Sequence, residues 1–241
     1  MAYIPENIKY LDKGFNLFLM NGHSRRAAFD DWLDMMICSF GMQKYEKTYL
    51  EIVGKYKKDE LEKFAEMFGW LIKHLEENQF TDPLGDYFQY CITRGEHGQY
   101  FTPSHVSNMM AEIVSPLGQE TVIDSSCGSG RMLLAAIEVA RKTGYDPYCF
   151  GADLDKTCVK MCAINLFLYG VDGEVACMNS ISNDFFFAYK LTNPFQGGLT
   201  IIDKKEDSII WKMGNKRFEK PIQEPELVKT EMVKMFQESL F

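Results

Sequence analysis

The sequence has little of what marks a secreted or membrane-spanning chain. Residues 1–10 hold no basic segment followed by a long apolar run, so we expect no secretory signal. Every apolar stretch falls far short of the roughly 20 residues that cross a bilayer. We therefore expect a cytoplasmic protein without a membrane partner.

Paired cysteine motifs are also lacking. The seven cysteines are odd in number, and five of them fall between residues 127 and 177. This distribution is not the disulfide framework of a small secreted domain. Cys158 and Cys162 lie four residues apart, but no second cysteine or histidine pair completes a zinc site. We expect no metal and interpret the cysteines as buried small side chains in a reduced protein.

A surplus of basic charge is missing as well. Lys and Arg number 26 against 34 Asp and Glu, which gives a net charge of -8 and a pI near 5.1. Nucleic-acid binding through bulk charge depends on Lys and Arg, so a chain that binds DNA tightly by itself is disfavoured. The acid is concentrated in residues 96–195, with 11 acidic and 6 basic groups. A local basic groove stays open as an alternative.

The composition that remains is that of an ordinary globular chain. Hydrophobic residues make up 46%, aromatic residues 14% and charged residues 25% of 241 positions, enough for one large or two modest domains. Residues 1–95 have helical spacing, as in Phe29, Trp32, Leu33, Met36 and Ile37. Helices are predicted over about 25–37, 59–75 and 84–91, and we interpret 1–95 as a helical N-terminal domain.

From residue 96 to 241 the pattern changes to alternating helices and strands. Thr102-Pro103 is a good helix start, with strands predicted at 120–124, 148–153 and 174–177. Helices are predicted between them at 131–142 and 156–169. Strands that alternate with helices form a parallel sheet with right-handed crossovers, so the second domain is predicted to have an α/β fold.

A glycine-containing loop between strand and helix is the main candidate for a binding site. Asp124 ends the first strand, and Gly128 and Gly130 permit close backbone approach ahead of the next helix. Asp153 ends the second strand, where a carboxylate can accept hydrogen bonds from ribose hydroxyls. The loop lacks the sequences that bind phosphate or NAD, and an acid at its mouth suits a cationic ligand. S-adenosylmethionine, with its sulfonium and amino groups, fits this description, although a plain turn is the alternative.

Three ordered segments carry a resemblance to a known family. Gly98 to Pro103 reads GQYFTP, Asp124 to Gly130 reads DSSCGSG, and Ala163 to Gly170 reads AINLFLYG. The sequence resembles the N6-adenine DNA methyltransferases, above all modification subunits of type I restriction systems and their type II relatives. The resemblance covers roughly residues 80–195. It implies a Rossmann-like, S-adenosylmethionine-dependent methyltransferase sheet with a helical N-terminal domain.

The resemblance also implies roles for individual residues. The methionine end of the cofactor pocket is expected to be shaped by Tyr100, Phe101, Thr102 and Pro103. The loop around the amino acid part is expected to be Asp124, Ser126, Cys127, Gly128 and Gly130. Asp153 is expected to hold the ribose hydroxyls, and the carbonyl oxygen of Asn179 to accept from the adenine amino group. Met178 or Ile181 is then expected to pack against the adenine ring, while a turn after a strand is the alternative for Asn179-Ser180.

The catalytic loop of the family is matched only in part. The family's [DNS]-P-P-[YFW] loop binds the amino group of a flipped-out adenine and stacks on the base. The single candidate here is Asn193-Pro194-Phe195, which has one proline fewer and has a chance Asn-Pro turn as its alternative. After Phe195 we expect a β-hairpin from 199–203 and 208–213, then a helical end from Glu224. The C-terminal part is expected to be shortened relative to full-length members.

Three functions remain open from the sequence. The first is an S-adenosylmethionine-dependent DNA adenine-N6 methyltransferase of a restriction-modification-like system, acting on DNA alone or with a specificity or other partner subunit. The second is a catalytically inactive cofactor-binding or interaction protein derived from such a methylase. The third is a methylase that acts on RNA, protein or a small molecule. Cysteine catalysis through Cys127 is disfavoured because no histidine is placed by sequence to activate it.

Overall fold

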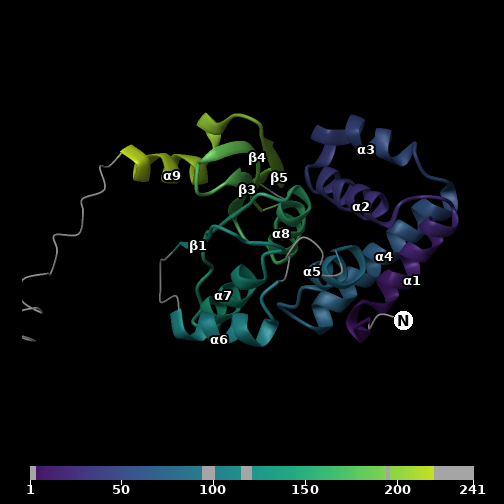
Figure 1. Ribbon diagram of the computed structural model, residues 1–241, viewed down its shortest axis with the longest axis horizontal. Coiled ribbons are helices and arrows are strands. Elements are labelled where there is room, and N and C mark those ends of the chain that lie inside the picture. The colour runs from purple at the N-terminus through teal and green to yellow at the C-terminus, as the bar shows by residue number, and fades with distance from the viewer. Residues whose placement is uncertain (1–3, 94–100, 115–120, 194–195, 220–241) are drawn as a thin grey trace, which may run out of the picture.

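The computed structural model describes residues 4–93, 101–114, 121–193 and 196–219 (Figure 1). A group of N-terminal helices lies on one side of the molecule, and a five-stranded sheet with its covering helices lies on the other. All seven cysteines are free and buried, which confirms their interpretation as small core side chains. Within the described ranges, none of the helices combines the length and apolar character needed to cross a bilayer.

The N-terminal helices form around a cluster of aromatic rings. A short 3-10 turn, η1 (Glu6–Ile8), leads into α1 (Lys9–Met20), and α2 (Arg25–Phe40) begins after Ser24, whose hydroxyl accepts a hydrogen bond from the Ala27 amide. The 3-10 turn η2 (Met42–Tyr45), α3 (Glu46–Val53) and α4 (Lys58–Glu77) follow. Phe15 is fully buried, and its ring meets those of Phe18, Phe29, Trp32, Phe64 and Tyr87. These helix-spaced aromatics therefore build a core.

A short connecting region links these helices to the sheet. α5 (Pro83–Tyr87) starts with Asp82 as its N-cap and continues as a π-helical segment, η3 (Phe88–Thr93). α6 (Ser104–Val114) then packs against α7 (Arg131–Lys142). The predicted helices at 84–91 and 131–142 are thus confirmed.

The sheet has the strand order β1-β2-β3-β4-β5. β1 (Val122–Asp124), β2 (Cys149–Asp153) and β3 (Gly173–Asn179) are parallel, joined by α7 and by α8 (Lys156–Leu168). β4 (Asp184–Leu191) and β5 (Leu199–Ile202) continue the sheet in antiparallel fashion. The predicted α/β fold with three parallel strands is confirmed.

The N-terminal helices and the sheet share one hydrophobic core. Buried residues from Ile8 to Leu199 belong to a single cluster, in which α8 lies between the sheet and α2 (Figure 1). Polar contacts across this junction include Lys160 to Asp34 at 2.8 Å and the Thr157 hydroxyl to Asp30 at 2.7 Å. The predicted domain boundary near residue 95 lies outside the described residues, and the halves on either side of it are packed together.

The predicted hairpin from 199–203 and 208–213 is wrong. A 3-10 turn, η6 (Lys205–Asp207), is followed by a helix, α9 (Ile209–Glu219), and β5 pairs with β4 instead. Ser208 caps α9 by accepting from the Trp211 amide at 3.1 Å. Ile210 packs with Phe150 and Met178 on the face of the sheet opposite α8. This cap and this burial outweigh the β propensity of the two isoleucines.

The outer edge of β5 is covered by residues that follow α2. The Ile201 amide donates to the Tyr45 hydroxyl at 2.7 Å, and Lys44 donates to the Gly197 carbonyl and the Thr200 hydroxyl. An edge strand with unpaired amides invites pairing with other chains, and these side chains occupy that edge.

Glu174 holds α9 against the sheet, and its removal should free that helix. The fully buried carboxylate accepts from the Ser208 hydroxyl and from the amides of Ile209 at 3.0 Å and Ile210 at 3.2 Å. Glu174→Ala leaves these donors without an acceptor, so we expect a loss of about 2–4 kcal/mol in the free energy of unfolding, measured in urea by circular dichroism. The exposed Glu206 on the same connection is the control, and an equal loss in Glu206→Ala would contradict this role.

Candidate functional site

Three polar side chains lie at neighbouring strand ends on one edge of the sheet. Asp124, Asp153 and Asn179 are the last residues of β1, β2 and β3. These strands are parallel neighbours, so their carboxyl ends meet at the same edge, which is where ligands bind in open α/β sheets. The structure therefore brings together three residues that the sequence places 55 positions apart at most.

The loop between β1 and α7 is held in place by backbone hydrogen bonds. The Cys127 amide donates to the Ala152 carbonyl at 2.8 Å, and the Gly128 amide donates to Asp153 Oδ2 at 2.9 Å. The Ser126 amide donates to Asp124 Oδ1 at 3.0 Å. Both carboxylates predicted to bind the cofactor thus also fix the loop, and each keeps lone pairs for a ligand.

Gly128 and Gly130 both have the left-handed backbone that favours glycine, with φ of +54° and +91°. A Cβ added at Gly128 would lie 2.9 Å from the ring of Phe101, and one at Gly130 would lie 2.9 Å from Cys162 Sγ. The loop can therefore approach Phe101 and α8 only because these positions lack side chains. Cys127 itself is buried, and a hydrogen bond with Cys162 together with burial raises its thiol pKa, which disfavours a nucleophilic role.

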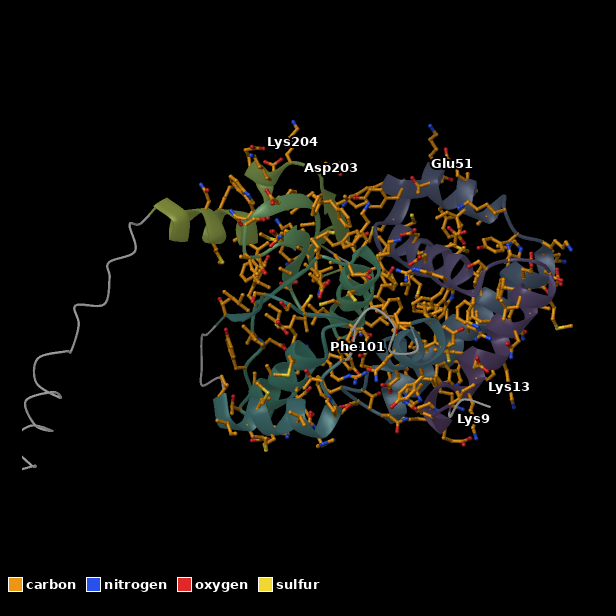
Figure 2. All side chains as sticks on the ribbon, in the orientation of Figure 1. Lys9, Lys13, Glu51, Phe101, Asp203 and Lys204 are labelled. Atoms are coloured by element: carbon orange, nitrogen blue, oxygen red, sulfur yellow. The ribbon has the colours of Figure 1, made fainter. Side chains whose placement is uncertain are left out.

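The segment ahead of α6 lies against this loop. Phe101 is located between the N-terminal helices and the sheet half (Figure 2), and its amide donates to Gln89 Oε1 at 3.1 Å. The Thr102 carbonyl accepts from Arg131 at 3.2 Å, and the Pro103 carbonyl accepts the first amides of α6. Phe101 and Thr102 are thus adjacent to the glycine loop, and their role in shaping a cofactor pocket stays a prediction. Tyr100 lies outside the described residues.

The site is acidic. Burial raises the pKa of Asp124, and the nearby Asp153 carboxylate raises it further. Among the described residues, no Lys or Arg forms an ion pair with either carboxylate. Two neighbouring carboxylates without a protein counter-charge favour a ligand that carries positive charge.

Asn179 makes a turn as well as ending β3. Its Oδ1 accepts from the amides of Ile181 at 3.0 Å and Ser182 at 3.3 Å, and the Ser180 hydroxyl donates to the Ser125 carbonyl. Both lone pairs of the amide oxygen are directed to the backbone, which leaves its NH2 group to face a ligand. Contact between Asn179 and an adenine stays a prediction. In that contact, Asn179 Nδ2 would donate a hydrogen bond to the adenine.

Exposed apolar side chains flank this edge of the sheet. Of the two residues predicted to pack on an adenine ring, Met178 is 3% exposed beneath α9, whereas Ile181 is 86% exposed. Leu154 is 61% exposed and directly follows Asp153, although no motif of the sequence points to it. Its position after an acidic strand end was the available signal. Leu154 and Ile181 are the side chains free to cover a planar ring.

The structure does not bring Asn193 to this site. β4 runs antiparallel to β3, so Leu191 pairs with Gly173 at the start of β3. Asn193 therefore lies at the opposite end of the sheet from Asn179, a separation of about 20 Å for seven strand residues at ~3.3 Å each. The Asn193 carbonyl accepts hydrogen bonds from the amides of Gln196 and Gly198. This pattern is that of a turn, which is the alternative interpretation of this segment. Pro194 and Phe195 lie outside the described residues.

The physical reason is the length of the connection between β3 and β4. Only residues 180–183 join the two strands, and Asn183 has φ +60° in this turn. A parallel strand would need a crossover of a dozen or more residues. The chain instead returns as a hairpin, which carries Asn193 away from the carboxyl edge.

Comparison with known proteins gives consistent matches. Residues 79–232 match the family described as N-6 DNA Methylase. The type I restriction enzyme MjaVIII methylase subunit of Methanocaldococcus jannaschii is 30% identical over 118 residues, covering 45% of this chain and 20% of that protein. The MjaIX methylase subunit of the same organism is 24% identical over 216 residues, covering 80% of this chain and 37% of that protein. The chain thus spans between a fifth and two fifths of the length of these two relatives.

A solved structure is also similar. It is the modification subunit assigned to a type I restriction enzyme of Vibrio vulnificus YJ016, with 22% identity and a TM-score of 0.38. The match covers 54% of this chain and 28% of that one.

The approach of Phe101 to Gly128 can be tested by stability measurements. Gly128→Ala and Gly170→Ala both place alanine at a positive φ, +54° and +66°, at a cost of about 1–2 kcal/mol each. Gly170 has no neighbour within 4 Å, whereas alanine at 128 must also displace Phe101, which adds about 1–3 kcal/mol. Urea unfolding should show the larger loss for Gly128→Ala. Equal losses would show that Phe101 does not lie on the loop.

Proposed function

The chain belongs to the N-6 DNA methylase family, and from this premise we propose that it binds S-adenosylmethionine at the carboxyl edge of β1, β2 and β3. We further propose that it does so as part of a methyltransferase that modifies the N6 amino group of adenine in DNA. When bound, the cofactor supplies an activated methyl group on a positively charged sulfur. The observation that carries the proposal is the acidic site beside the loop with two left-handed glycines.

The residues at this edge fit the parts of such a cofactor. Asp124 faces the amino acid part, where its carboxylate attracts the ammonium and sulfonium charges. Asp153 holds the ribose hydroxyls with the lone pairs that the amides of Gly128 and Asp155 leave open. Leu154 and Ile181 cover the adenine ring, and Asn179 Nδ2 donates to a ring nitrogen. Gly128 gives close access to the backbone, since a Cβ there would meet Phe101.

DNA and a partner subunit are part of the proposal. The relatives are named as methylase subunits of type I restriction enzymes, and this chain has a net charge of -8. A chain with this charge gains little from counterion release on DNA. We therefore expect a specificity or other partner subunit to supply much of the binding affinity for the duplex.

Methyl transfer also needs acceptors that draw the adenine amino group toward the methyl group. In the described part of the chain, no Asn-Pro-Pro-aromatic sequence lies at the carboxyl edge, and Asn193 lies at the far end of the sheet. Those acceptors are expected to approach from beside β1, which pairs only with β2 among the described strands. We therefore expect Asn193→Ala to leave cofactor affinity unchanged.

The cofactor proposal is tested by titration calorimetry with S-adenosylmethionine and S-adenosylhomocysteine, which lacks the sulfonium charge. Asp124→Asn should weaken S-adenosylmethionine binding by about 1.5–3 kcal/mol, roughly 10- to 100-fold, and S-adenosylhomocysteine binding by less. Asp153→Asn should weaken both ligands alike, because both carry the ribose. Asp172→Asn, an exposed acid ahead of β3 at the opposite end of the sheet, is the matched control. The proposal fails if the unaltered protein binds neither ligand.

Methyl transfer requires its own assay. Transfer of a labelled methyl group to mixed-sequence duplex DNA should be detected with a specificity subunit present, and its product should be N6-methyladenine. Transfer to cytosine, or to RNA in preference to DNA, would overturn the adenine-DNA part of the proposal. Tight cofactor binding with no transfer to any nucleic acid would instead select the catalytically inactive alternative.

A further inference from the structure

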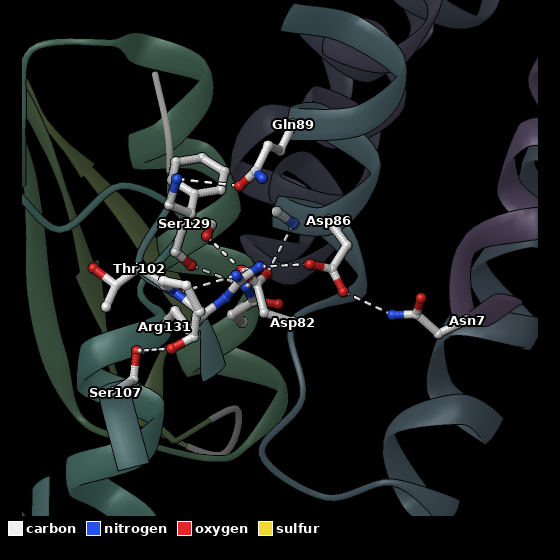
Figure 3. A network of polar contacts seen from close by, with 12 residues as sticks. Asn7, Asp82, Asp86, Gln89, Thr102, Ser107, Ser129 and Arg131 are labelled. Carbon is white, nitrogen blue, oxygen red and sulfur yellow. Dashed lines mark hydrogen bonds and ion pairs between the residues drawn. The ribbon is translucent and has the colours of Figure 1, made fainter. Parts of the chain in front are cut away.

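Asp82 belongs to the N-terminal half of the chain but reaches into the cofactor half. It is the N-cap of α5, where its Oδ1 accepts from the Gly85 amide at 2.9 Å, and it is 3% exposed. Its other partners are Ser129, Arg131 and Asn165, which come from the glycine loop, the start of α7 and the middle of α8 (Figure 3). One carboxylate thus joins four segments of the molecule.

Within the described ranges, this carboxylate accepts five hydrogen bonds, and the nearby Asp86 carboxylate is itself paired with Arg131. Oδ2 accepts from the Ser129 hydroxyl at 2.5 Å and from Arg131 Nε and Nη2 at 3.2 and 3.0 Å. Oδ1 accepts from the Gly85 amide and from Asn165 Nδ2, both at 2.9 Å. Burial raises the pKa of Asp82, while the charge of Arg131 opposes that rise. A side chain of equal size that carries its own N–H groups would meet donors in this position.

The approach of Asp82 to the loop depends on Gly85. A Cβ at Gly85 would lie 2.0 Å from Asp82 Oδ2 and 2.4 Å from Ser129 Oγ. Any side chain at this position would therefore separate α5 from the loop. Asn165 strengthens the same junction, since its Nδ2 also donates to the Ser129 carbonyl at 2.9 Å, while its own buried Oδ1 has no partner in the described part of the chain.

The same short region also contacts the Phe101–Thr102 segment. Arg131 forms an ion pair with Asp86 at 2.8 Å and donates to the Thr102 carbonyl, and its guanidinium lies 5.8 Å from the centre of the Phe101 ring. Gln89 accepts from the Phe101 amide. Asp82, Asp86 and Gln89 thus fix the loop and the Phe101–Thr102 segment relative to one another.

We propose that Asp82 is a positioning residue for cofactor binding, which sets the geometry of the Gly128–Gly130 turn through Ser129 and Arg131 without touching the ligand. This inference rests on the proposed function. Asp82 lies behind the turn, and its contacts fix the Ser129 side chain while Asn165 fixes the Ser129 carbonyl. The N-terminal helices therefore determine whether the loop is preformed for the ligand.

A purely structural ion pair would cost stability alone, so the test uses affinity as its readout. Asp82→Asn should lower the affinity for S-adenosylmethionine and for S-adenosylhomocysteine equally, by tenfold or more, because the loop backbone contacts both ligands. This differs from Asp124→Asn, which should act mainly on the sulfonium ligand. Ser129→Ala removes one hydroxyl and keeps the ion pair, so it replaces Asp82→Asn as the test if that variant folds poorly. Ser129→Ala should lower the affinity for both ligands three- to tenfold.

Asp34→Asn is the matched control. Asp34 also forms an ion pair across the two halves, with Lys160 on α8, but neither residue touches the loop. This variant should lower the melting temperature and change affinity by less than twofold. The Asp82→Asn Ser129→Ala double variant should bind no more weakly than the weaker single variant, because both changes break the same contact.

Hydrogen exchange provides a readout that needs no ligand. Amide exchange over residues 126–131 should rise at least tenfold in Asp82→Asn relative to the unaltered protein, with no comparable rise in Asp34→Asn. If the unaltered protein binds neither ligand, the proposed function fails and the inference fails with it. If it binds and Asp82→Asn and Ser129→Ala bind equally well with unchanged loop exchange, the positioning role alone is overturned.

Discussion

The buried pair of Asp82 and Arg131 is the interaction on which the arrangement of the two halves depends. Its carboxylate and guanidinium are 1% and 10% exposed, and they are joined at 3.0 Å. Removing two charges from water is costly, and a buried pair adds little net stability unless every remaining donor and acceptor is satisfied. Here the remaining groups are satisfied by the loop, by α8 and by the segment that leads into α6. The pair therefore specifies one relative placement of α5, the loop and α7.

A second constraint is the short turn between β3 and β4. Four residues cannot carry the chain across the sheet to a parallel position, so the sheet changes from parallel to antiparallel at β3. This change keeps the carboxyl ends of β1, β2 and β3 together at one edge, where we propose that the ligand binds, and sends residues 192–193 to the far end. Short connections thus separate two segments that the sequence alone suggests should act together.

The structure shows where the acidic residues of the region 96–195 lie. Asp124 and Asp153 lie at neighbouring strand ends, whereas Asp155 forms an ion pair with Arg26 of the N-terminal half. Glu174, which is fully buried, has a different task, because it accepts hydrogen bonds from the first turn of α9. Acidic residues of this region therefore differ in role: Glu174 caps a helix, Asp155 contacts the N-terminal half, and Asp124 and Asp153 are proposed to attract the ligand.

The sequence by itself determined helices such as α2, α4, α7 and α8, the three parallel strands and the two carboxylates beside the glycine loop. These features follow from local periodicity, from caps such as Ser24 and Asp82, and from glycines at positive φ, all of which are encoded within short segments. The sequence could not determine that residues 209–213 are helical, because the carboxylate that caps them comes from β3, 34 residues earlier in the chain. It also could not place Asn193 or reveal Leu154, since strand direction and side-chain exposure depend on which segments pack together. The role of Asp82 was equally hidden, because its partners lie 47 to 83 residues away and meet it only when the helices pack against the sheet.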